Sequence, residues 1–593
     1  MKTGLIAAAL SVAFAVTTIA GETVGFASRP MLAGKASLTE EGYVVWHDLG
    51  TARFSPGLEI PVELVYGSAS EQCGPFGFAW RSPQLESSAR WDKDGMLWTA
   101  PWGEKVKFFP KNEKTPKDAV KIEVVEEAKK GRGYYAPYSD WEADVLSGNP
   151  QKGASWIVRG RRDKTGWSLV YVGSRLSKVT APSGKSLDFV YGEEGLTSIS
   201  QDGVAFVELA YSGRTATSVT VGGVRHALAY EDRTLEILPH TKDGRVARPT
   251  LPQLVSVRRA SLAPVVFGYR GNFLASVRRG EAVEDIAFEM NGRVARITSD
   301  REFDYSYAGG VTLTDRLGRK ASYDYNAQNG VFRISEFSGR KYEIYYFMRY
   351  DVAYLGRVRK IVDGKGNDVV GYRYDAKSGN VTRVRDRFGN DRNFEYDAEG
   401  RLVKATRRAA GDRTVEPVAS FAYGKGRRPT SVALLDAKGQ TAVTTRIAYD
   451  AAGRPVSVGD GRGKTEISYS RAGYPTAIKD AFGNITRICY NAFNAPVTVT
   501  DANGIVTEYT YNDAGCVTRI VRRDGSEVLS SLDVAYDRCG LPVSYTDQDG
   551  LVTAFERDAF GRVLKERFAD GSEVGYTYER WGTDPNARTE NER

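Results

Sequence analysis

The chain has 593 residues and a mass of 65.2 kDa, with 41% hydrophobic and 26% charged residues. This length exceeds what one compact core normally supports, so the chain is either several domains or a quasi-linear repeat array. Its net charge of +8 is spread along the chain rather than gathered in one basic run. A nucleic-acid partner would need a contiguous basic patch. We therefore expect no nucleic-acid partner.

The first twenty residues have the pattern of a secretory signal peptide. Lys2 precedes an apolar run from Leu5 to Ile19, and we expect cleavage after Ala20 or, as a second choice, after Ala27. The apolar run is too short to span a bilayer comfortably, and no other stretch is apolar enough to do so. The sequence thus predicts Sec-type export of a mature protein without a membrane span. Its location would be periplasmic, extracellular or at the cell surface.

The next segment, residues 21–165, holds nearly all of the tryptophans. A Gly/aromatic run at 74–80 follows short apolar strands, and Asp94-Gly95 is typical of a hairpin turn. The charged stretch 111–130 indicates a surface insertion. We expect a separate β-rich domain that caps the first repeat, with its tryptophans in the core rather than on a sugar-binding surface.

From residue 166 to residue 580 the chain repeats itself. Tyrosines recur about every twenty residues from Tyr171 onward, and the pattern is plainest between Tyr449 and Tyr578. In that stretch the repeat begins at positions 449, 469, 490, 511, 536, 557 and 578, and position 557 carries an arginine in place of the tyrosine. A fixed period in this range predicts a repeat architecture. Residues 581–593 form a polar tail, which we expect to be frayed.

Each repeat unit reads as one β-hairpin with two turn signals. Tyr449 is followed by Asp450 and Gly453, and a second Asp-x-x-Gly follows at 460–463. Asp caps the start of such a turn and Gly accepts a positive φ at its end. Between the turns, polar and apolar residues alternate and β-branched residues are common, as in strands. Tyrosines two residues apart share a face, so we interpret them as mainly structural. The residues that define the repeat are Tyr449, Asp450, Gly453, Tyr511, Gly515, Tyr536, Asp537, Gly540, Asp558, Gly561 and Tyr578.

The sequence offers no pattern typical of catalysis, cofactor binding or metal binding. Its three histidines are far apart, and its four cysteines lack metal-ligand spacing. An Asp-x-x-Gly turn supplies one or two oxygen ligands, whereas a calcium loop needs five or more. We therefore expect no catalytic residue, no metal and no cofactor. Cys489, Cys516 and Cys539 fall in successive repeats, so a disulfide between two of them could form in an oxidising compartment.

The Tyr-Asp-x-x-Gly-Arg unit with its second Asp-x-x-Gly turn resembles the YD repeats of the Rhs (rearrangement hotspot) proteins, over roughly residues 166–580. The Gly-Pro-Phe-Gly-Phe-Ala-Trp run at 74–80 and the Trp-x-x-x-Gly-x-x-Trp run at 91–98 look like the domain that precedes the repeats in that family. The resemblance implies β-hairpins that spiral into a hollow shell. In bacterial toxin systems that shell encloses a C-terminal toxic domain, and in teneurins a similar shell serves adhesion.

The sequence departs from the toxin-bearing members at its C-terminal end. Those members end their repeats with a core block containing Asp-Pro-x-Gly-Leu, which helps to release the toxin by self-cleavage. Here Asp584-Pro585 is a lone dipeptide, so we expect neither self-cleavage nor toxicity. The hairpins are also few for a closed shell. The expected fold is all-β: tandem hairpins in a curved or spiralling sheet, a partial shell, behind a β-rich N-terminal domain.

These observations favour an exported, non-enzymatic scaffold that binds or partly encloses a polypeptide or a surface glycan. The alternative is a component or truncated remnant of an Rhs polymorphic-toxin delivery system. A carbohydrate-active enzyme that uses paired acids in the tryptophan-rich segment is the least favoured hypothesis. We also expect self-association through the terminal repeat, because an unpaired sheet edge invites a partner.

Overall fold

The structure is a computed structural model of the 593-residue chain. The residues that it describes are 36–39, 42–55, 58–67, 72–92, 95–101, 105–110, 133–135, 141–160, 166–181, 184–234, 249–288, 294–298, 302–306, 311–315, 318–326, 331–336, 338–346, 357–376, 378–425 and 428–578. The expected signal peptide with its cleavage site at Ala20, the insertion at 111–130 and the tail at 581–593 lie outside these residues.

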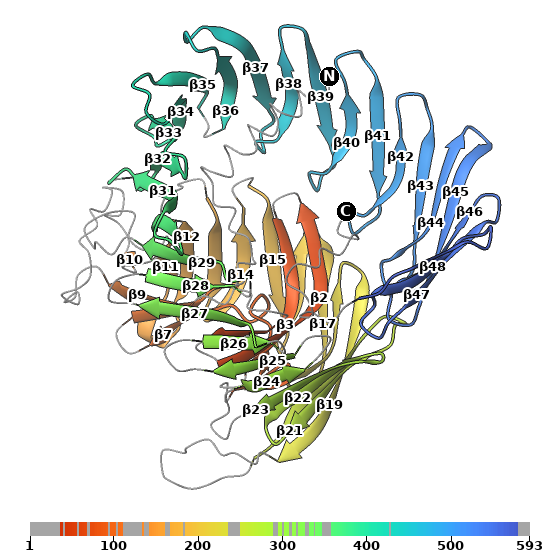
Figure 1. The fold of residues 1–593 in the computed structure, drawn as a ribbon. Helices are drawn as coiled ribbons and strands as arrows, with labels where there is room; N and C mark the ends of the chain where they lie inside the picture. The colour runs from red at the N-terminus through yellow and green to blue at the C-terminus, as the bar shows by residue number, and fades with distance from the viewer. Residues whose placement is uncertain are drawn as a thin grey trace.

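The described part is almost entirely antiparallel β-sheet, and the expected all-β fold of tandem hairpins is confirmed (Figure 1). One long sheet runs from β7 to β49, and each strand in it pairs with its neighbours in the sequence. A short 3-10 helix, η2 (Pro150–Lys152), lies between two of its strands. The alternating sequence pattern therefore produces one extended, curling sheet.

The long sheet begins with eight strands that close into a ring. The ring strands are β7 (Ser88–Asp92), β8 (Gly95–Thr99), β9 (Lys105–Pro110), β10 (Gly133–Tyr135), β11 (Trp141–Ser147), β12 (Ser155–Gly160), β13 (Ser168–Val172) and β14 (Arg175–Thr180). β14 returns to β7, where Arg175 pairs with Ser88. The sheet is continuous across residue 165, because β12 pairs with β13. The tryptophan-rich segment and the first repeat thus share one ring.

The ring is filled by aromatic side chains. Trp98 and Trp156 are fully buried, as we expected for tryptophans of the core. Trp98 Nε1 donates to Tyr171 Oη at 2.7 Å, and the same hydroxyl lies 2.7 Å from Ser87 Oγ. A buried indole and phenol usually need such partners. The first tyrosine of the repeat series therefore sits in the ring core.

Beyond the ring, the sheet continues through three groups of strands. The early strands are β15 (Ser186–Tyr191), β16 (Leu196–Gln201), β17 (Val204–Ser212), β18 (Thr215–Val221), β19 (Val224–Thr234), β20 (Thr250–Arg259), β21 (Val265–Arg270), β22 (Phe273–Arg279) and β23 (Ala282–Phe288). The connecting strands are β24 (Val294–Thr298), β25 (Glu302–Ser306), β26 (Val311–Asp315), β27 (Lys320–Asn326), β28 (Val331–Ser335), β29 (Lys341–Tyr346), β30 (Val358–Asp363), β31 (Asp368–Tyr374), β32 (Val381–Asp386), β33 (Asp391–Tyr396), β34 (Leu402–Arg408), β35 (Glu416–Tyr423), β36 (Pro429–Leu435) and β37 (Thr441–Tyr449). The late strands are β38 (Pro455–Asp460), β39 (Gly463–Tyr469), β40 (Pro475–Lys479), β41 (Ile485–Tyr490), β42 (Pro496–Thr500), β43 (Val506–Tyr511), β44 (Val517–Asp524), β45 (Glu527–Tyr536), β46 (Pro542–Asp547), β47 (Val552–Arg557), β48 (Val563–Arg567) and β49 (Glu573–Gly575).

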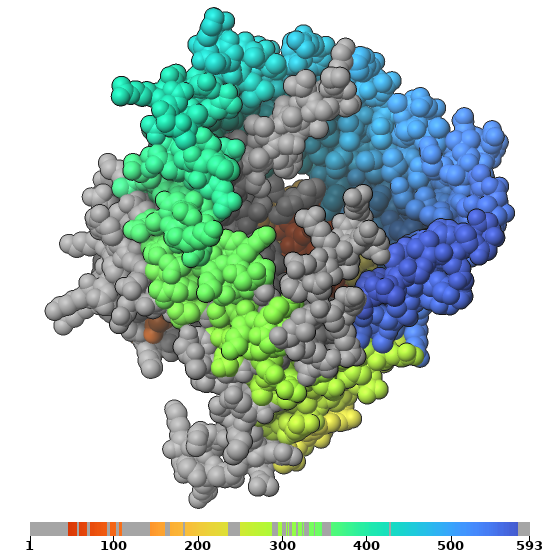
Figure 2. All heavy atoms as spheres, viewed as in Figure 1, coloured from red at the N-terminus to blue at the C-terminus, as the bar shows by residue number. Residues whose placement is uncertain are grey.

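The sheet curls because its repeats carry a bulge at the tyrosine. The pairing register shifts between Ala448 and Tyr449, and again just before Tyr490, Tyr511 and Tyr536. A β-bulge bends its strand and increases the local twist. Because the bulge recurs on the same side of the sheet, its bends add up. The sheet consequently winds round a central hollow (Figure 2).

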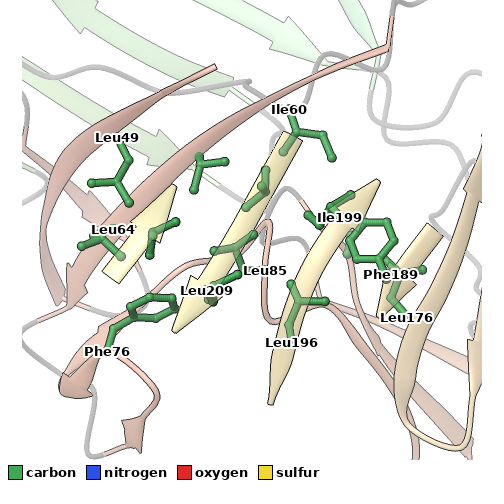
Figure 3. Close-up of a cluster of buried hydrophobic side chains, with 14 of the residues drawn as sticks. Leu49, Ile60, Leu64, Phe76, Leu85, Leu176, Phe189, Leu196, Ile199 and Leu209 are labelled. Atoms are coloured by element: carbon green, nitrogen blue, oxygen red, sulfur yellow. The ribbon is translucent and has the colours of Figure 1, made fainter. Parts of the chain in front are cut away.

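A separate small sheet lies inside the curl. It consists of β1 (Ala36–Thr39), β2 (Gly42–Ser55), β3 (Leu58–Gly67) and β6 (Trp80–Arg81), with β4 (Cys73–Gly74) and β5 (Gly77–Phe78) forming a two-stranded pair beside it. Its side chains Leu49, Ile60 and Leu64 face Ile199 and Leu209 of the early strands (Figure 3). These contacts form the main hydrophobic core of the described protein.

The Gly/aromatic run at 74–80 fixes this inner sheet to the early strands. Gly77 has a φ of +91°, and a Cβ there would lie 2.7 Å from the Pro252 carbonyl oxygen. Only glycine avoids both the strain and the clash at this position. Trp80 Nε1 donates to Tyr269 Oη at 2.7 Å, so the run attaches the inner sheet to β20 and β21.

Candidate functional site

Each Asp-x-x-Gly turn that follows a repeat tyrosine is held by its own aspartate. Asp450 Oδ1 accepts from the backbone N–H groups two and four residues later, at 3.0 and 2.8 Å, and Oδ2 accepts from Arg454 Nε at 2.7 Å. Gly453 takes a φ of +74°, as a turn end requires. The Arg454 guanidinium lies 4.8 Å from the Tyr469 ring centre and donates to the Ser470 carbonyl at 3.3 Å. The Asp–Arg pair therefore closes its own turn and joins it to the next repeat.

The repeat tyrosines form a series of hydroxyl-to-carbonyl hydrogen bonds. Tyr449 Oη donates to the Pro429 carbonyl at 2.9 Å, and Tyr511 Oη donates to the Pro496 carbonyl at 2.7 Å. Each acceptor begins the preceding strand, where a proline costs no sheet hydrogen bond. Burial raises the pKa of both hydroxyls. The other tyrosines that make this bond are Tyr211, Tyr269, Tyr374, Tyr396, Tyr423, Tyr469, Tyr490 and Tyr536. These bonds give the tyrosines a structural role.

The remaining repeat-defining residues occupy equivalent places. Asp537 and Asp558 each accept from the N–H groups two and four residues later. The turn glycines have φ of +76° at Gly515, +83° at Gly540 and +85° at Gly561. Tyr578 departs from the series, because its side chain is 43% exposed and its ring lies 4.9 Å from the Arg562 guanidinium.

The long sheet has two different faces. On the face that carries the repeat tyrosines, Ile467 lies opposite Ile478. On the other face Glu466 lies opposite Lys479, with carboxylate and ammonium 3.7 Å apart. The tyrosine face is the one that packs on the small sheet inside the curl (Figure 3), so we call it the inner face. The inner face is thus apolar and the outer face is charged.

Among the described residues, the inner face is covered over the early strands but not over most of the late strands. Phe189, Ile199 and Leu209 on the early strands are 7%, 0% and 8% exposed, because the small sheet lies on them. From β39 to β47, the described residues bury the equivalent side chains only in part, whereas Val458 on β38 is buried. These side chains are Ile467, Ile478, Ile488, Val499, Tyr509, Ile520, Val534, Tyr545 and Phe555. We call this set the open inner face, and it is the candidate functional site.

Turns of the late strands dock on the ends of the early strands and on β2 of the small sheet, along a line that we call the seam. Asn494 Nδ2 donates to the Arg53 carbonyl at 2.9 Å, and Arg259 Nη2 donates to the Ala514 carbonyl at 2.5 Å. Ala514 is completely buried although it lies in a turn. The Arg259–Ala514 contact joins residues 255 positions apart in the sequence. One lap of the spiral therefore takes roughly 250 residues, and the spiral closes laterally on itself.

The seam also contains apolar contacts. The Phe493 ring lies 6.2 Å from the Phe206 ring, edge to face, and packs directly against Gly223. Gly280 leaves room for Cys539, whose Sγ would lie 2.8 Å from a Cβ at that glycine. The partial shell expected from the sequence is consequently closed along the seam.

The sequence carries a signal for the seam that our reading of the repeats missed. Three of the turns that follow a repeat position outside the seam have an arginine at the fifth position, namely Arg401, Arg454 and Arg562, and each is bound to the first aspartate of its turn. The seam turns have other residues there, namely Tyr474, Ala495, Cys516 and Leu541. An arginine would occupy the space through which the early turns approach. The repeats that lack this arginine are therefore the ones whose turns contact the preceding lap of the spiral.

The disulfide expected among Cys489, Cys516 and Cys539 is not formed, because all three are free thiols. Cys489 is on β41, Cys516 precedes β44, and Cys539 lies in the turn before β46. Neighbouring strands are about 4.8 Å apart, so two or three strands separate these residues by roughly 10 to 14 Å. A disulfide needs Cα atoms within about 7 Å.

The described residues contain no group of three or more His, Cys, Asp or Glu side chains placed to hold a metal ion. In the same part of the chain, no helix has the length and apolar character needed to cross a bilayer. The open inner face offers apolar contact and aromatic surface.

Comparison with known proteins supports the repeat assignment. A family model described as RHS repeat matches residues 374–413, 490–527 and 536–573. Solved structures that align with the chain include TcdB2–TccC3–Cdc42, at 9% identity and a TM-score of 0.28, over 84% of this chain and 36% of that one. TcdB2–TccC3 aligns at 10% identity and a TM-score of 0.28, over 91% and 37% of the two chains. The Tc holotoxin pore of Photorhabdus luminescens aligns at 9% identity and a TM-score of 0.27, over 94% and 42%.

The chain spans less than half of the length of each of these structures. A comparison with curated proteins found no match. The family-model matches fall on the tandem Tyr-Asp-x-x-Gly hairpins from which the curled sheet is built. These three stretches of the chain are therefore RHS (YD) repeats.

Proposed function

We propose that this protein is a non-enzymatic scaffold that encloses a polypeptide against the open inner face of its late strands. The observation that carries the proposal is the difference between the two halves of one inner face. Over the early strands this face binds the chain's own small sheet and becomes almost inaccessible. The same apolar pattern continues over the late strands, where the described residues leave it partly exposed.

The size of this apolar surface supports a polypeptide as the occupant. Fully burying one large apolar side chain stabilises by about 1.5 to 3 kcal/mol, so completing the burial of a partly exposed one adds about 1 kcal/mol. The open inner face presents nine such side chains across the late strands. An extended or folded segment of polypeptide can contact several of them together, whereas a sugar ring contacts one or two. Surface-glycan binding is therefore the second candidate, and it rests on the aromatic rings of Tyr509, Tyr545 and Phe555.

The signal-peptide pattern at residues 1–20 supports export. We include Sec-type export with cleavage after Ala20 in the proposal. N-terminal sequencing of the protein isolated from its host would give Gly21 as the first residue. An intact Met1 would contradict export by this route.

A role in a toxin-delivery system is the alternative within the same fold, and it rests on the Rhs repeats. The two roles differ in the partner, because a delivery role requires a toxic polypeptide as the enclosed cargo. Mass spectrometry of the polypeptide that copurifies with the exported protein separates them.

The test compares two neighbouring residues that point to opposite faces. Ile488 lies on the open inner face and Arg487 lies on the exposed outer face of β41. We expect Ile488→Glu to abolish copurification of a polypeptide from the exported fraction, because it places a charge where apolar contact is needed. Arg487→Glu changes the net charge more and should leave the partner bound. Equal loss in both variants, or no partner with the parent protein, would contradict the proposal.

A further inference from the structure

A cluster of arginines lies on the outer face of the connecting strands. Arg373 on β31 lies directly opposite Arg383 on β32. Arg385 and Arg408 flank the same region, each opposite Asp391 on β33. Residues directly opposite each other on antiparallel strands share a face. Four cationic side chains therefore converge around one carboxylate.

Asp391 is the one carboxylate that the described residues place inside this cluster, and both of its oxygens accept hydrogen bonds from arginines. Its side chain is 1% exposed, beneath the arginines. Its Oδ1 and Oδ2 accept from Nε and Nη2 of Arg385 at 2.8 and 2.9 Å, and Oδ2 also accepts from Arg408. Arg383 Nε is 3.8 Å from Oδ1. One negative charge thus serves three guanidinium groups.

No other described carboxylate completes the neutralisation. Asp368 also attracts Arg385, but its carboxylate is bound by Lys360 Nζ at 3.0 Å. Arg383 has a lowered pKa, because burial disfavours its charge and the charges of Arg373, Arg385 and Arg408 repel it. Like charges placed directly opposite each other destabilise a sheet. An arrangement of this kind is stable when an anion binds between the cations.

We propose that Arg373, Arg383, Arg385 and Arg408 form an outward-facing binding site for a tetrahedral oxyanion, a phosphate or sulfate group. Asp391 binds the Nε edge of Arg385 and fixes the position of that guanidinium. Arg383 and Arg373, which are held less tightly, have N–H groups available to an incoming oxygen. Guanidinium groups bind phosphate and sulfate oxygens in bidentate fashion. The site is on the face opposite to the open inner face, so it does not depend on enclosure of a polypeptide.

Isothermal titration calorimetry with inorganic phosphate and inorganic sulfate tests the site, with chloride adjusted to keep the ionic strength constant. We expect Arg383→Gln and Arg373→Gln each to weaken binding of both anions about tenfold, since each removes one charge-assisted contact. Arg487→Gln removes an exposed outer-face arginine outside the cluster and should change affinity by less than about twofold. Thermal unfolding controls for folding: without phosphate, the two cluster variants should be at least as stable as the parent, because they relieve repulsion.

A further comparison distinguishes the source of the anion. Glucose 6-phosphate carries the same group as an ester. If it binds at least as tightly as inorganic phosphate, the site recognises an ester on a larger ligand, and if it binds much more weakly the ligand is the free anion. Both results support the site. Phosphate binding no stronger than chloride binding, or an equal loss in Arg487→Gln, would overturn it.

Discussion

The seam provides a direct test of the spiral, because a glycine and a phenylalanine from different laps meet there. A Cβ at Gly223 would lie 2.3 Å from the Phe493 ring, and Gly223 has a φ of +82°. Gly223→Ala therefore costs about 1 to 2 kcal/mol in backbone strain and a further 1 to 3 kcal/mol in overpacking. Phe493→Ala removes a half-buried ring and should cost about 1 to 3 kcal/mol.

The two changes should not be additive. Once Phe493 is alanine, the clash disappears and Gly223→Ala costs only its backbone strain. We expect the double variant to be more stable than the sum of the single effects by about 1 to 3 kcal/mol. Native-state hydrogen exchange of the Gly222 amide measures this non-additivity at the seam, because that amide donates to the Phe206 carbonyl at 2.8 Å.

Gly213 provides the matched control for the backbone term. It also has a positive φ, of +55°, but a Cβ there meets nothing within 4 Å. Gly213→Ala should therefore combine additively with Phe493→Ala. If Gly223→Ala were also additive with Phe493→Ala, the two laps would not be in contact at this place and the closed spiral would be refuted.

Three further predictions concern the inner sheet, a buried histidine and the tyrosine series. Gly77→Ala should weaken attachment of the small sheet by about 2 to 4 kcal/mol. Limited proteolysis should then cleave that sheet faster, while the circular dichroism of the variant stays unchanged. Resistance to proteolysis equal to that of the parent would contradict the close approach to Pro252. Burial, with a nearby arginine, lowers the pKa of His226 to about 4, so the folded state favours the neutral imidazole. The contribution of His226 to the free energy of unfolding is therefore fully present above pH 6.5. It falls by up to about 3 kcal/mol as the pH drops to 4. His226→Gln should flatten this dependence in urea titrations, and an unchanged slope would refute it. Tyr511→Phe should cost about 1 kcal/mol in the same assay through loss of its hydrogen bond to Pro496, and a neutral effect would remove the structural role of the hydroxyl.

The hairpin repeat was predictable because its determinants are local. Asp450, Gly453 and Arg454 act within five residues, and the tyrosine period fixes which residues share a face. The strand pattern and the turns could therefore be read directly, together with the burial of the ring tryptophans.

The seam and the arginine site depend on contacts that no local pattern contains. Arg259 meets Ala514 only after the bulges of a whole lap have set the curvature of the sheet. Arg383 comes to lie beside Arg408 through the register of two successive strand pairs. The charges appear scattered along the sequence for this reason, although the sheet brings these four arginines together. The missing fifth-position arginine, as at Ala495 and Cys516, was the one available sign of the seam.

The central claim is that the open inner face contacts an enclosed polypeptide, and a photocrosslinking amino acid tests it most directly. Tyr509 and Glu508 are adjacent on β43 and point to the inner and outer faces. In protein made in its own host, a crosslinker at 509 should attach reproducibly to one polypeptide that resists protease while the seam is intact. The same crosslinker at 508 should not capture that polypeptide. Capture of it from position 508, or no polypeptide crosslinked at 509, would contradict enclosure.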